Sequence, residues 1–219
     1  MKLGIYGSGD SGREAKEVAE RIGTWTEIIF IDDVVTTDTY KGIKKMLFDD
    51  FKKQYSPMEA EIIIALGEPE YRVKLFKKVK EAGYSFANLI DPSAYLSSEV
   101  TIGTGIILKA GVWVSVGATL KDNICVDFHT VIGHDVVIQP HCQICSNVVI
   151  AGHCKIGSAT YIGLSVPIRD GIVVGDNVVL GMGSVVVRDI PDNVIAMGNP
   201  ARAIKKKDDS KVFKEYYHG

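Results

Sequence analysis

The chain of 219 residues has the composition of an ordinary soluble protein, with 46% hydrophobic residues, 24% charged residues and a formal net charge of −2. It is long enough for two small domains, each with a core of its own. The charge excludes a strongly basic nucleic-acid binder, and no apolar run reaches the ~20 residues that cross a bilayer, so we expect a cytoplasmic protein.

The first 90 residues predict a small α/β domain with a parallel sheet. Hydrophobic patterns indicate strands at 2–6, 27–33 and 61–65 and helices at 13–22 and 69–82. A unit of this length lacks the paired halves that hold a full dinucleotide, so a mononucleotide or a nucleotide-sugar is the better ligand.

The turn after the first strand, Gly7-Ser-Gly9-Asp10-Ser11-Gly12, has the glycine spacing that brings backbone amides and a helix terminus up to a phosphate. Asp32 and Asp33 close the second strand, where acidic residues contact a bound nucleotide. Two interpretations stay open: a nucleotide-binding turn, and a tight strand-to-helix connection without a ligand.

The second half of the chain carries a strict six-residue repeat. Fifteen positions in steps of six are aliphatic: Ile102, Leu108, Val114, Leu120, Val126, Ile132, Ile138, Ile144, Ile150, Ile156, Ile162, Ile168, Val174, Leu180 and Val186. A second series, two residues earlier, runs from Val100 to Ser184 and is small or β-branched. We expect both series to point inward, and we expect the glycines that often follow the aliphatic residue, such as Gly103 and Gly133, to supply permissive turn angles.

Neither a helix nor an alternating strand brings apolar residues back every six positions. A triangular parallel β-coil does, with three hexads in a coil of about 18 residues and about 4.8 Å between coils. The repeat therefore predicts a β-helix of roughly five coils over residues 91–204, with no long loop, and a polar tail at 205–219.

All four cysteines fall inside the repeat, at Cys125, Cys142, Cys145 and Cys154. Their number and placement do not suit a secreted disulfide framework, so we expect reduced thiols. Cys142 and Cys145 have the spacing of a zinc or redox pair, but there is no second pair and no strand-helix context around them. Small buried hydrophobic side chains are the simpler interpretation, and we expect no metal.

Three stretches carry a resemblance to a known family: Val-Ile-Gly-His-Asp at 131–135, Val-Ile-Ala-Gly at 149–152 and Gly-Asn-Pro-Ala-Arg at 198–202. Over almost its whole length the chain resembles the bacterial sugar acetyltransferases that join a small Rossmann-like domain to a left-handed parallel β-helix. That group includes the nucleotide-aminosugar N-acetyltransferases of the bacillosamine and perosamine type and the sialic-acid O-acetyltransferases.

The resemblance implies that acetyl-CoA is the co-substrate and that the amino group of a nucleotide-linked aminosugar is acetylated in bacterial surface-glycan biosynthesis. O-acetylation of sialic acid or a related sugar is the alternative within enzymes, because one base serves both acceptors. A trimeric β-helix scaffold without activity is a second alternative.

By resemblance, His134 is the general base and Asp135 is the carboxylate that raises its basicity. An imidazole titrating near neutrality is suited to take a proton from the acceptor. Gly152 lies one coil beyond His134, so stacking places its backbone N–H beside the base as a donor to the oxyanion. Asp127 stands where we expect an asparagine that assists the base, which makes it a further candidate.

The remaining contacts of the family are also carried over by resemblance. Those to acetyl-CoA fall on Gln143, Gly152, Leu164 and Met182, and those to the nucleotide-sugar fall on Gly9, Asp10, Ser11, Asp32 and Asp33. The Asp10-Ser11 pair replaces the usual Gly-His, and an extra carboxylate facing a diphosphate is repulsive unless it turns away.

Members of this family form trimers that bury one face of the prism and hold acetyl-CoA between two subunits, and the resemblance implies the same homotrimer here. The other histidines have a simpler interpretation. We expect His129, His141 and His153 to be solvated turn residues and His218 to lie in the polar tail.

Overall fold

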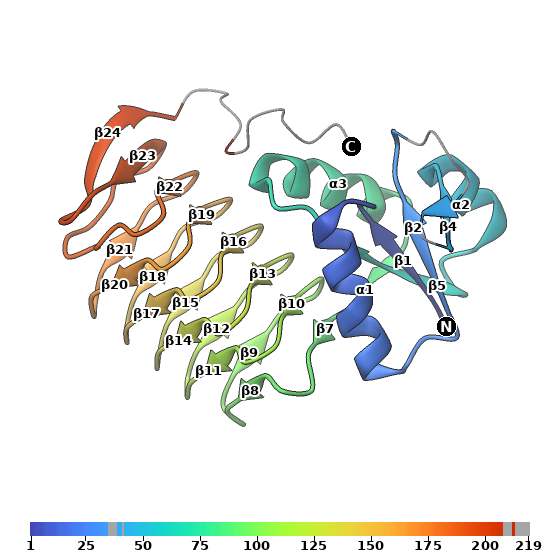
Figure 1. Cartoon of the computed structure of the whole chain (residues 1–219), viewed down its shortest axis with the longest axis horizontal. Helices are drawn as coiled ribbons and strands as arrows, with labels where there is room; N and C mark the ends of the chain where they lie inside the picture. Colours follow the sequence, from blue (N-terminus) through green and yellow to red (C-terminus); the bar gives the residue numbers. More distant parts are fainter. Residues whose placement is uncertain (35–38, 41, 208–211, 213–219) are drawn as a thin grey trace.

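The computed structural model describes residues 1–34, 39–40, 42–207 and 212. It contains an α/β domain beside a left-handed parallel β-helix, which confirms the predicted fold class (Figure 1). His218 and most of the predicted tail lie outside the described residues. Within the described part, no helix is long and apolar enough to cross a membrane.

The α/β domain has a six-stranded sheet in the order β3 (Thr39–Tyr40), β4 (Ile43–Met46), β2 (Glu27–Ile31), β1 (Lys2–Tyr6), β5 (Ala60–Ile64) and β6 (Ser85–Phe86). Its helices are α1 (Asp10–Ile22), α2 (Phe48–Gln54) and α3 (Pro69–Glu81). Helix α1 packs on one face through Ala15 and Val18, and the other face is covered by Phe51 of α2 and Val79 of α3. The three predicted strands and two predicted helices are confirmed to within three residues.

Three sheets form the β-helix. The eight-stranded sheet contains β7 (Leu89–Ile90), β10 (Ile107–Leu108), β13 (Cys125–Val126), β16 (Gln143–Ile144), β19 (Tyr161–Ile162), β22 (Val179–Leu180), β23 (Val194–Met197) and β24 (Arg202–Lys206). The first five-stranded sheet contains β8 (Tyr95–Leu96), β11 (Trp113–Val114), β14 (Val131–Ile132), β17 (Val149–Ile150) and β20 (Pro167–Ile168). The second contains β9 (Thr101–Ile102), β12 (Thr119–Leu120), β15 (Val137–Ile138), β18 (Lys155–Ile156) and β21 (Val173–Val174).

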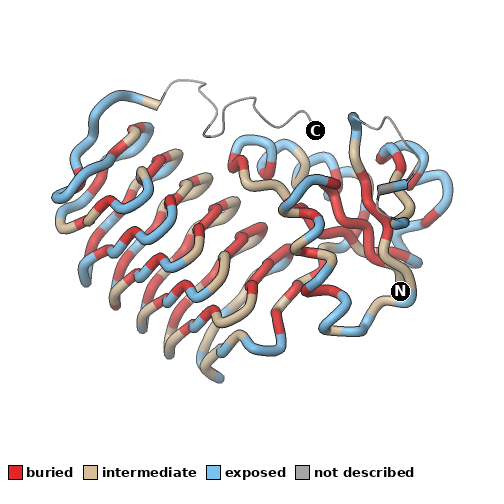
Figure 2. Tube along the Cα trace, in the orientation of Figure 1, coloured by how far each residue is buried: buried red, intermediate tan, exposed pale blue. Residues whose placement is uncertain are grey.

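Both predicted inward series form the core of the β-helix. Each aliphatic residue lies beside its equivalent 18 positions later, as Ile138 does beside Ile156. From Ile106 to Val186 the apolar side chains of both series belong to one buried cluster, and buried residues recur in every coil (Figure 2). The prediction is less accurate at the two ends, because Ile102 is partly exposed in the first coil and Lys205 and Lys206 belong to β24 rather than to a loose tail.

The left-handed turn position differs from the one expected. Every sixth residue from Gly105 to Gly183 has φ between +52° and +72°, and this residue follows the aliphatic one by three positions, not by one. Glycines such as Gly133 and Gly157 are required by close packing rather than by turn angles, because a Cβ on either would overlap the backbone of the next coil. Asn, Asp and His tolerate the left-handed conformation better than other side chains do, which places His129, His141 and His153 there.

A fully buried arginine, Arg72 of α3, forms hydrogen bonds that link the α/β domain to the β-helix. Its guanidinium donates to the Ile64 and Leu66 carbonyl oxygens and to both oxygens of Asn123 in the coil. The Asn123 amide in turn lies 2.8 Å from Nδ1 of His141. The expectation that His141 is solvated is therefore wrong, because its ring is half-buried against Phe76.

We expect His141 at this junction to make the stability of the protein depend on pH. Burial and the nearby Arg72 lower the pKa of His141. The unfolded chain therefore binds the proton more tightly, so the free energy of unfolding should fall as pH drops below about 6.5. We expect His141→Asn, which suits the left-handed backbone, to flatten the change in urea midpoint between about pH 7.5 and about pH 5.5. His129→Asn, at an exposed turn of the same conformation, should keep the wild-type change, and an unchanged slope in His141→Asn would contradict the prediction.

Candidate active site

His134 and Gly152 occupy equivalent turns in consecutive coils. The two strands before them pair in register, Val131 with Val149 and Ile132 with Ile150. The turns are joined by a hydrogen bond of 2.9 Å from the His153 amide to the His134 carbonyl oxygen. A Cβ placed on Gly152 would overlap Cε1 and Nε2 of His134, so the imidazole packs directly on the glycine. The predicted adjacency of these two residues is confirmed.

The imidazole of His134 is oriented by its chain neighbour. Its Nδ1 lies 3.1 Å from Oδ2 of Asp135, and both side chains are about half exposed. A proton on Nδ1 donated to this carboxylate leaves a lone pair on Nε2, which is the form that accepts a proton. This arrangement leaves Nε2, the ring nitrogen without the Asp135 contact, beside Gly152, where it can accept a proton.

The backbone amide of Gly152 is available as a donor. Within residues 1–34, 39–40, 42–207 and 212 it makes no hydrogen bond, whereas the amides on either side of it, at Ala151 and His153, are both bonded to other coils. An unpaired amide beside a base is the element that stabilises an oxyanion in acyl transfer.

His153 is also part of this edge, which the sequence analysis does not predict. Its Nδ1 lies 3.7 Å from Oδ2 of Asp135, and its ring meets that of His134 edge-on with centroids 4.7 Å apart. The signal was present in the sequence, because His153 follows Asp135 by one 18-residue coil.

Asp127 and Gln143 lie elsewhere on the prism. They belong to the eight-stranded sheet and its following turn, and Nε2 of Gln143 donates to Oδ2 of Asp127 at 3.0 Å. The other oxygen of Asp127 pairs with Lys109, which also pairs with Glu14 of α1. Burial alone would lower the pKa of Lys109, but neighbouring anionic groups raise it above its ordinary value.

The structure does not bring Asp127 to His134 within one chain. Strand β14 separates them, so they lie on opposite edges of the first five-stranded sheet. We call the turns that hold His134 and Gly152 the His134 edge, and the turns on the other side of that sheet the Leu164 edge.

Leu164 and Met182 lie together on the Leu164 edge, at equivalent turns after the paired strands β19 and β22. Their side chains are exposed, to 46% for Leu164 and 76% for Met182. The predicted acetyl-CoA contacts are thus divided, with Gly152 on one edge of the sheet and these two apolar residues on the other.

The four cysteines are free and buried, as expected for structural thiols. Burial raises the pKa of Cys142 to about 12 and that of Cys145 to about 11. These thiols are therefore protonated at neutral pH and are poor metal ligands.

The two predicted aspartates follow β2 and have different partners, the glycine turn for Asp32 and β1 with α3 for Asp33. Asp32 accepts hydrogen bonds from the backbone and hydroxyl of Ser8. Asp33 accepts from the hydroxyl of Tyr6 at 2.6 Å and from Lys78 of α3 at 2.8 Å. Burial opposes ionisation of Asp33, but its bonds to Lys78 and Tyr6 outweigh this and lower its pKa.

The backbone of this turn has two different glycine requirements. A Cβ on Gly12 would overlap the Gly7 carbonyl oxygen, which explains why α1 can start so close to β1. Gly9 precedes α1, and no atom beyond its two chain neighbours lies within 4 Å of its missing Cβ, so a ligand can approach there. Asp10 is exposed and pairs with Arg13 at 3.0 Å, while Ser11 is half-buried in the first turn of α1.

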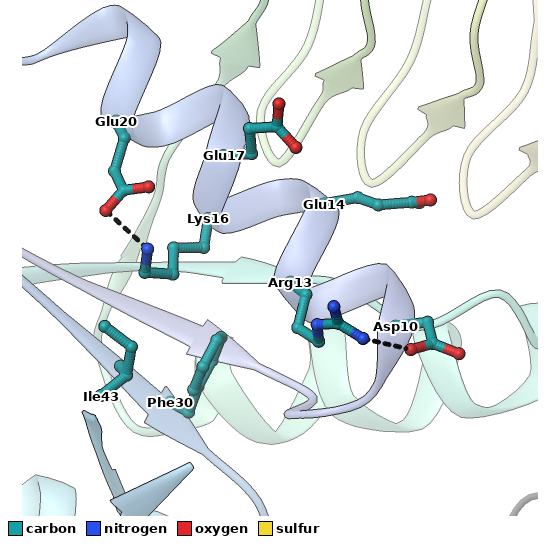
Figure 3. A pocket seen from close by; sticks show the side chains of 8 residues that line it. All are labelled: Asp10, Arg13, Glu14, Lys16, Glu17, Glu20, Phe30 and Ile43. Atoms are coloured by element: carbon teal, nitrogen blue, oxygen red, sulfur yellow. Dashed lines mark hydrogen bonds and ion pairs between the residues drawn. The ribbon is translucent and has the colours of Figure 1, made fainter. Parts of the chain in front are cut away.

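A hollow of about 580 Å³ lies along α1, lined by Asp10, Arg13, Glu14, Lys16, Glu17, Glu20, Phe30 and Ile43. Figure 3 shows that two of its acidic side chains, Asp10 and Glu20, are paired with Arg13 and Lys16. Four carboxylates against two cations make this hollow unsuitable for a diphosphate. It shares only Asp10 with the predicted substrate site.

Comparisons with known proteins agree with the geometry. Residues 2–79 match the PglD N-terminal domain family. The acetyltransferase domain of PglB from Neisseria gonorrhoeae, solved with acetyl coenzyme A, is 30% identical over 93% of this chain and 98% of that chain, with a TM-score of 0.88. PerB from Caulobacter crescentus, solved with CoA and GDP-perosamine, is 25% identical over 94% of this chain and 98% of that chain, with a TM-score of 0.84.

A curated relative matches over a shorter stretch. The galactoside O-acetyltransferase of Escherichia coli is 46% identical over 59 residues, which are 26% of this chain and 29% of that enzyme. A Rossmann-like domain followed by a hexapeptide-repeat β-helix with a histidine on one edge defines a class of acetyl-CoA-dependent acyltransferases. Within that class, the chain belongs to the family of hexapeptide-repeat sugar N-acetyltransferases that includes the acetyltransferase domain of PglB.

The contact between His134 and Gly152 generates a test. Gly152→Ala should displace the imidazole, because the new methyl group overlaps its Cε1 and Nε2 atoms, and we expect turnover to fall roughly 10²-fold. The backbone at Gly152 is not left-handed, so circular dichroism and the melting temperature should stay near wild type. Ser158→Ala, at the equivalent position of the next turn along the chain, should keep wild-type turnover. Full activity in Gly152→Ala would contradict the assignment.

Proposed function

We propose that this protein transfers an acetyl group from acetyl-CoA to the amino group of a nucleotide-linked aminosugar, with His134 as the general base. The observation that carries the proposal is the packing of the His134 imidazole on Gly152 with Asp135 at Nδ1. The acetyl-CoA and GDP-perosamine bound to the two solved relatives support both substrate classes.

In the proposed reaction, Nε2 of His134 accepts a proton as the acceptor nitrogen forms its bond to the thioester carbon. The Gly152 amide donates to the carbonyl oxygen as it becomes negative. Asp135 holds Nδ1–H and stabilises the imidazolium that results. Cleavage of the carbon–sulfur bond then releases the CoA thiolate, which takes the proton back from His134.

We assign the nucleotide-sugar to the turn at Gly9, Asp10 and Ser11. The first amides of an α-helix have no partner within the helix, and α1 begins at Asp10, so these amides are suited to bind phosphate oxygens. The negative charge of Asp10 is offset by Arg13, which reduces its repulsion of a diphosphate. Asp32 and Asp33 lie at the same edge of the sheet and offer acceptors for hydroxyl or base N–H groups.

We place the reaction in the cytoplasm and within bacterial surface-glycan biosynthesis. Four free, buried cysteines fit a reducing compartment, and that compartment supplies acetyl-CoA. The pathway rests on resemblance to the family.

The principal test is turnover of purified full-length protein with acetyl-CoA and a panel of nucleotide-linked aminosugars, GDP-perosamine among them. Thiol release and product mass spectrometry report the reaction. We expect His134→Asn to lower kcat roughly 10²- to 10⁴-fold with little change in KM for acetyl-CoA. His129→Asn should behave as wild type. Near-normal kcat in His134→Asn would exclude the base role, and no thiol release with any acceptor would favour the scaffold alternative.

A sugar hydroxyl is the second candidate acceptor. The stretch of 46% identity to galactoside O-acetyltransferase favours it, and the same imidazole serves a hydroxyl as well as an amine. An ester product is cleaved by hydroxylamine whereas an amide is stable, so treatment of the product decides between the two.

We propose that the chain is a homotrimer built on the first five-stranded sheet. The outward residues of this sheet are all apolar: Tyr95, Trp113, Val131, Val149 and Pro167. The first four are between 38% and 49% exposed. The second five-stranded sheet instead presents Thr101, Thr119, Val137, Lys155 and Val173.

Burying this apolar sheet in a three-fold ring would complete the site. The His134 edge and the Leu164 edge flank the sheet, so a ring brings the His134 edge of one subunit towards the Leu164 edge of the next. The acetyl-CoA contacts at Leu164 and Met182 and the candidate Asp127 would then come from a neighbouring subunit.

A charge on this face should break the trimer. We expect Val149→Glu to elute as a single chain in size exclusion with light scattering, and to lose turnover, because three buried carboxylates would meet an apolar surface without partners. Lys155→Glu, exposed on the second five-stranded sheet, should remain trimeric and active. A wild-type protein that has the mass of one chain, or a trimeric Val149→Glu, would overturn this assembly.

A further inference from the structure

The His134 edge carries three potential metal ligands within one short stretch of surface. His134, Asp135 and His153 each offer an atom, and these atoms lie within 4.8 Å of one another. We propose that this cluster binds a divalent transition-metal ion of the Zn²⁺ type, through Nδ1 of both imidazoles and Oδ2 of the carboxylate.

Two of the three ligand separations are close to those around a tetrahedral ion. A Zn²⁺ ion with bonds of about 2.0–2.2 Å separates its ligand atoms by about 3.3–3.6 Å. The two histidine nitrogens lie 3.1 Å and 3.7 Å from the same oxygen of Asp135. The third separation, between the two histidines, is at most 4.8 Å. Side-chain rotations that shorten it would close the site, and such rotations are open to side chains that are half exposed.

The backbone holds the cluster in place. Asp135 and His153 occupy the same left-handed position in consecutive coils, with φ of +57° and +58°. The hydrogen bond between the His153 amide and the His134 carbonyl oxygen fixes the two turns against each other. All three ligands are thus set by the coil repeat rather than by a flexible loop, which lowers the entropic cost of binding an ion.

The ligand set selects the class of ion. Two imidazoles and one carboxylate favour Zn²⁺, Co²⁺, Ni²⁺ or Cu²⁺ over Mg²⁺ and Ca²⁺, which prefer oxygen. Three protein ligands leave a fourth position that solvent or a substrate can fill.

Metal binding has a consequence that rests on the proposed function. An ion at Nδ1 of His134 replaces the proton there, so a neutral imidazole must carry its proton on Nε2. Such a ring cannot accept a proton from the acceptor. Bound metal should therefore inhibit acetyl transfer reversibly, and a chelator should restore it.

The binding test uses Co²⁺, whose visible absorption bands report tetrahedral coordination by protein ligands. Full-length protein free of CoA is titrated with Co²⁺, and Zn²⁺ is then added to displace it. We expect wild-type protein to show saturable bands that Zn²⁺ abolishes. His153→Asn keeps a residue suited to the left-handed turn and should lose these bands, whereas His129→Asn should retain them. Bands of equal intensity in His153→Asn, or none in the wild type, would overturn the site.

The inhibition test measures turnover from the disappearance of the acetyl-CoA thioester. For each variant, the rate with Zn²⁺ is divided by the rate without it. We expect at least a 10-fold loss in the wild type that excess EDTA reverses, and less than a twofold loss in His153→Asn. Cobalt bands together with full activity in Zn²⁺ would support the metal site and would overturn the role of His134 as base. Inhibition that persists in His153→Asn would place the inhibiting ion elsewhere and count against the site.

Discussion

Register between coils is the constraint on which this structure depends. The backbone hydrogen bonds run along the prism, as from Val137 to Cys154 and from Lys155 to Ile172. Each residue therefore lies beside the one 18 positions later, and the inward aliphatic side chains stack on their equivalents in one buried cluster. No loop interrupts this order between β7 and β22, so the outward residues recur at the same spacing as the inward ones.

The left-handed turns give a physical reason to distinguish one histidine from the others. His129, His141 and His153 all occupy the left-handed position, where the backbone itself favours Gly, Asn, Asp or His. The residue type at these turns, Asp135 included, is therefore not by itself a sign of function, and the roles given to Asp135 and His153 rest on their contacts. His134 lies one position earlier, where the backbone makes no such demand and where the side chain reaches Gly152.

Much of the fold could be predicted because it is periodic. The six-residue repeat specifies inward positions, and counting by 18 places Gly152 beside His134. Counting by six would also have separated Asp127 from His134. The two are seven residues apart, and one face of the prism takes six, so they lie at different edges. Docking of the two domains could not be predicted this way, because Arg72 and Lys109 find their partners through tertiary packing between segments far apart in sequence.

Strand β24, the last in the described part of the chain, protects the open end of the stack. A parallel β-helix ends in exposed backbone donors and acceptors that could pair with the end of another molecule. Here β24 turns back to pair antiparallel with β23 (Figure 1). Its residues Arg202, Lys205 and Lys206 are exposed. Positive charge at this edge repels a second copy approaching end to end, so lateral packing can proceed while growth into a fibre is disfavoured.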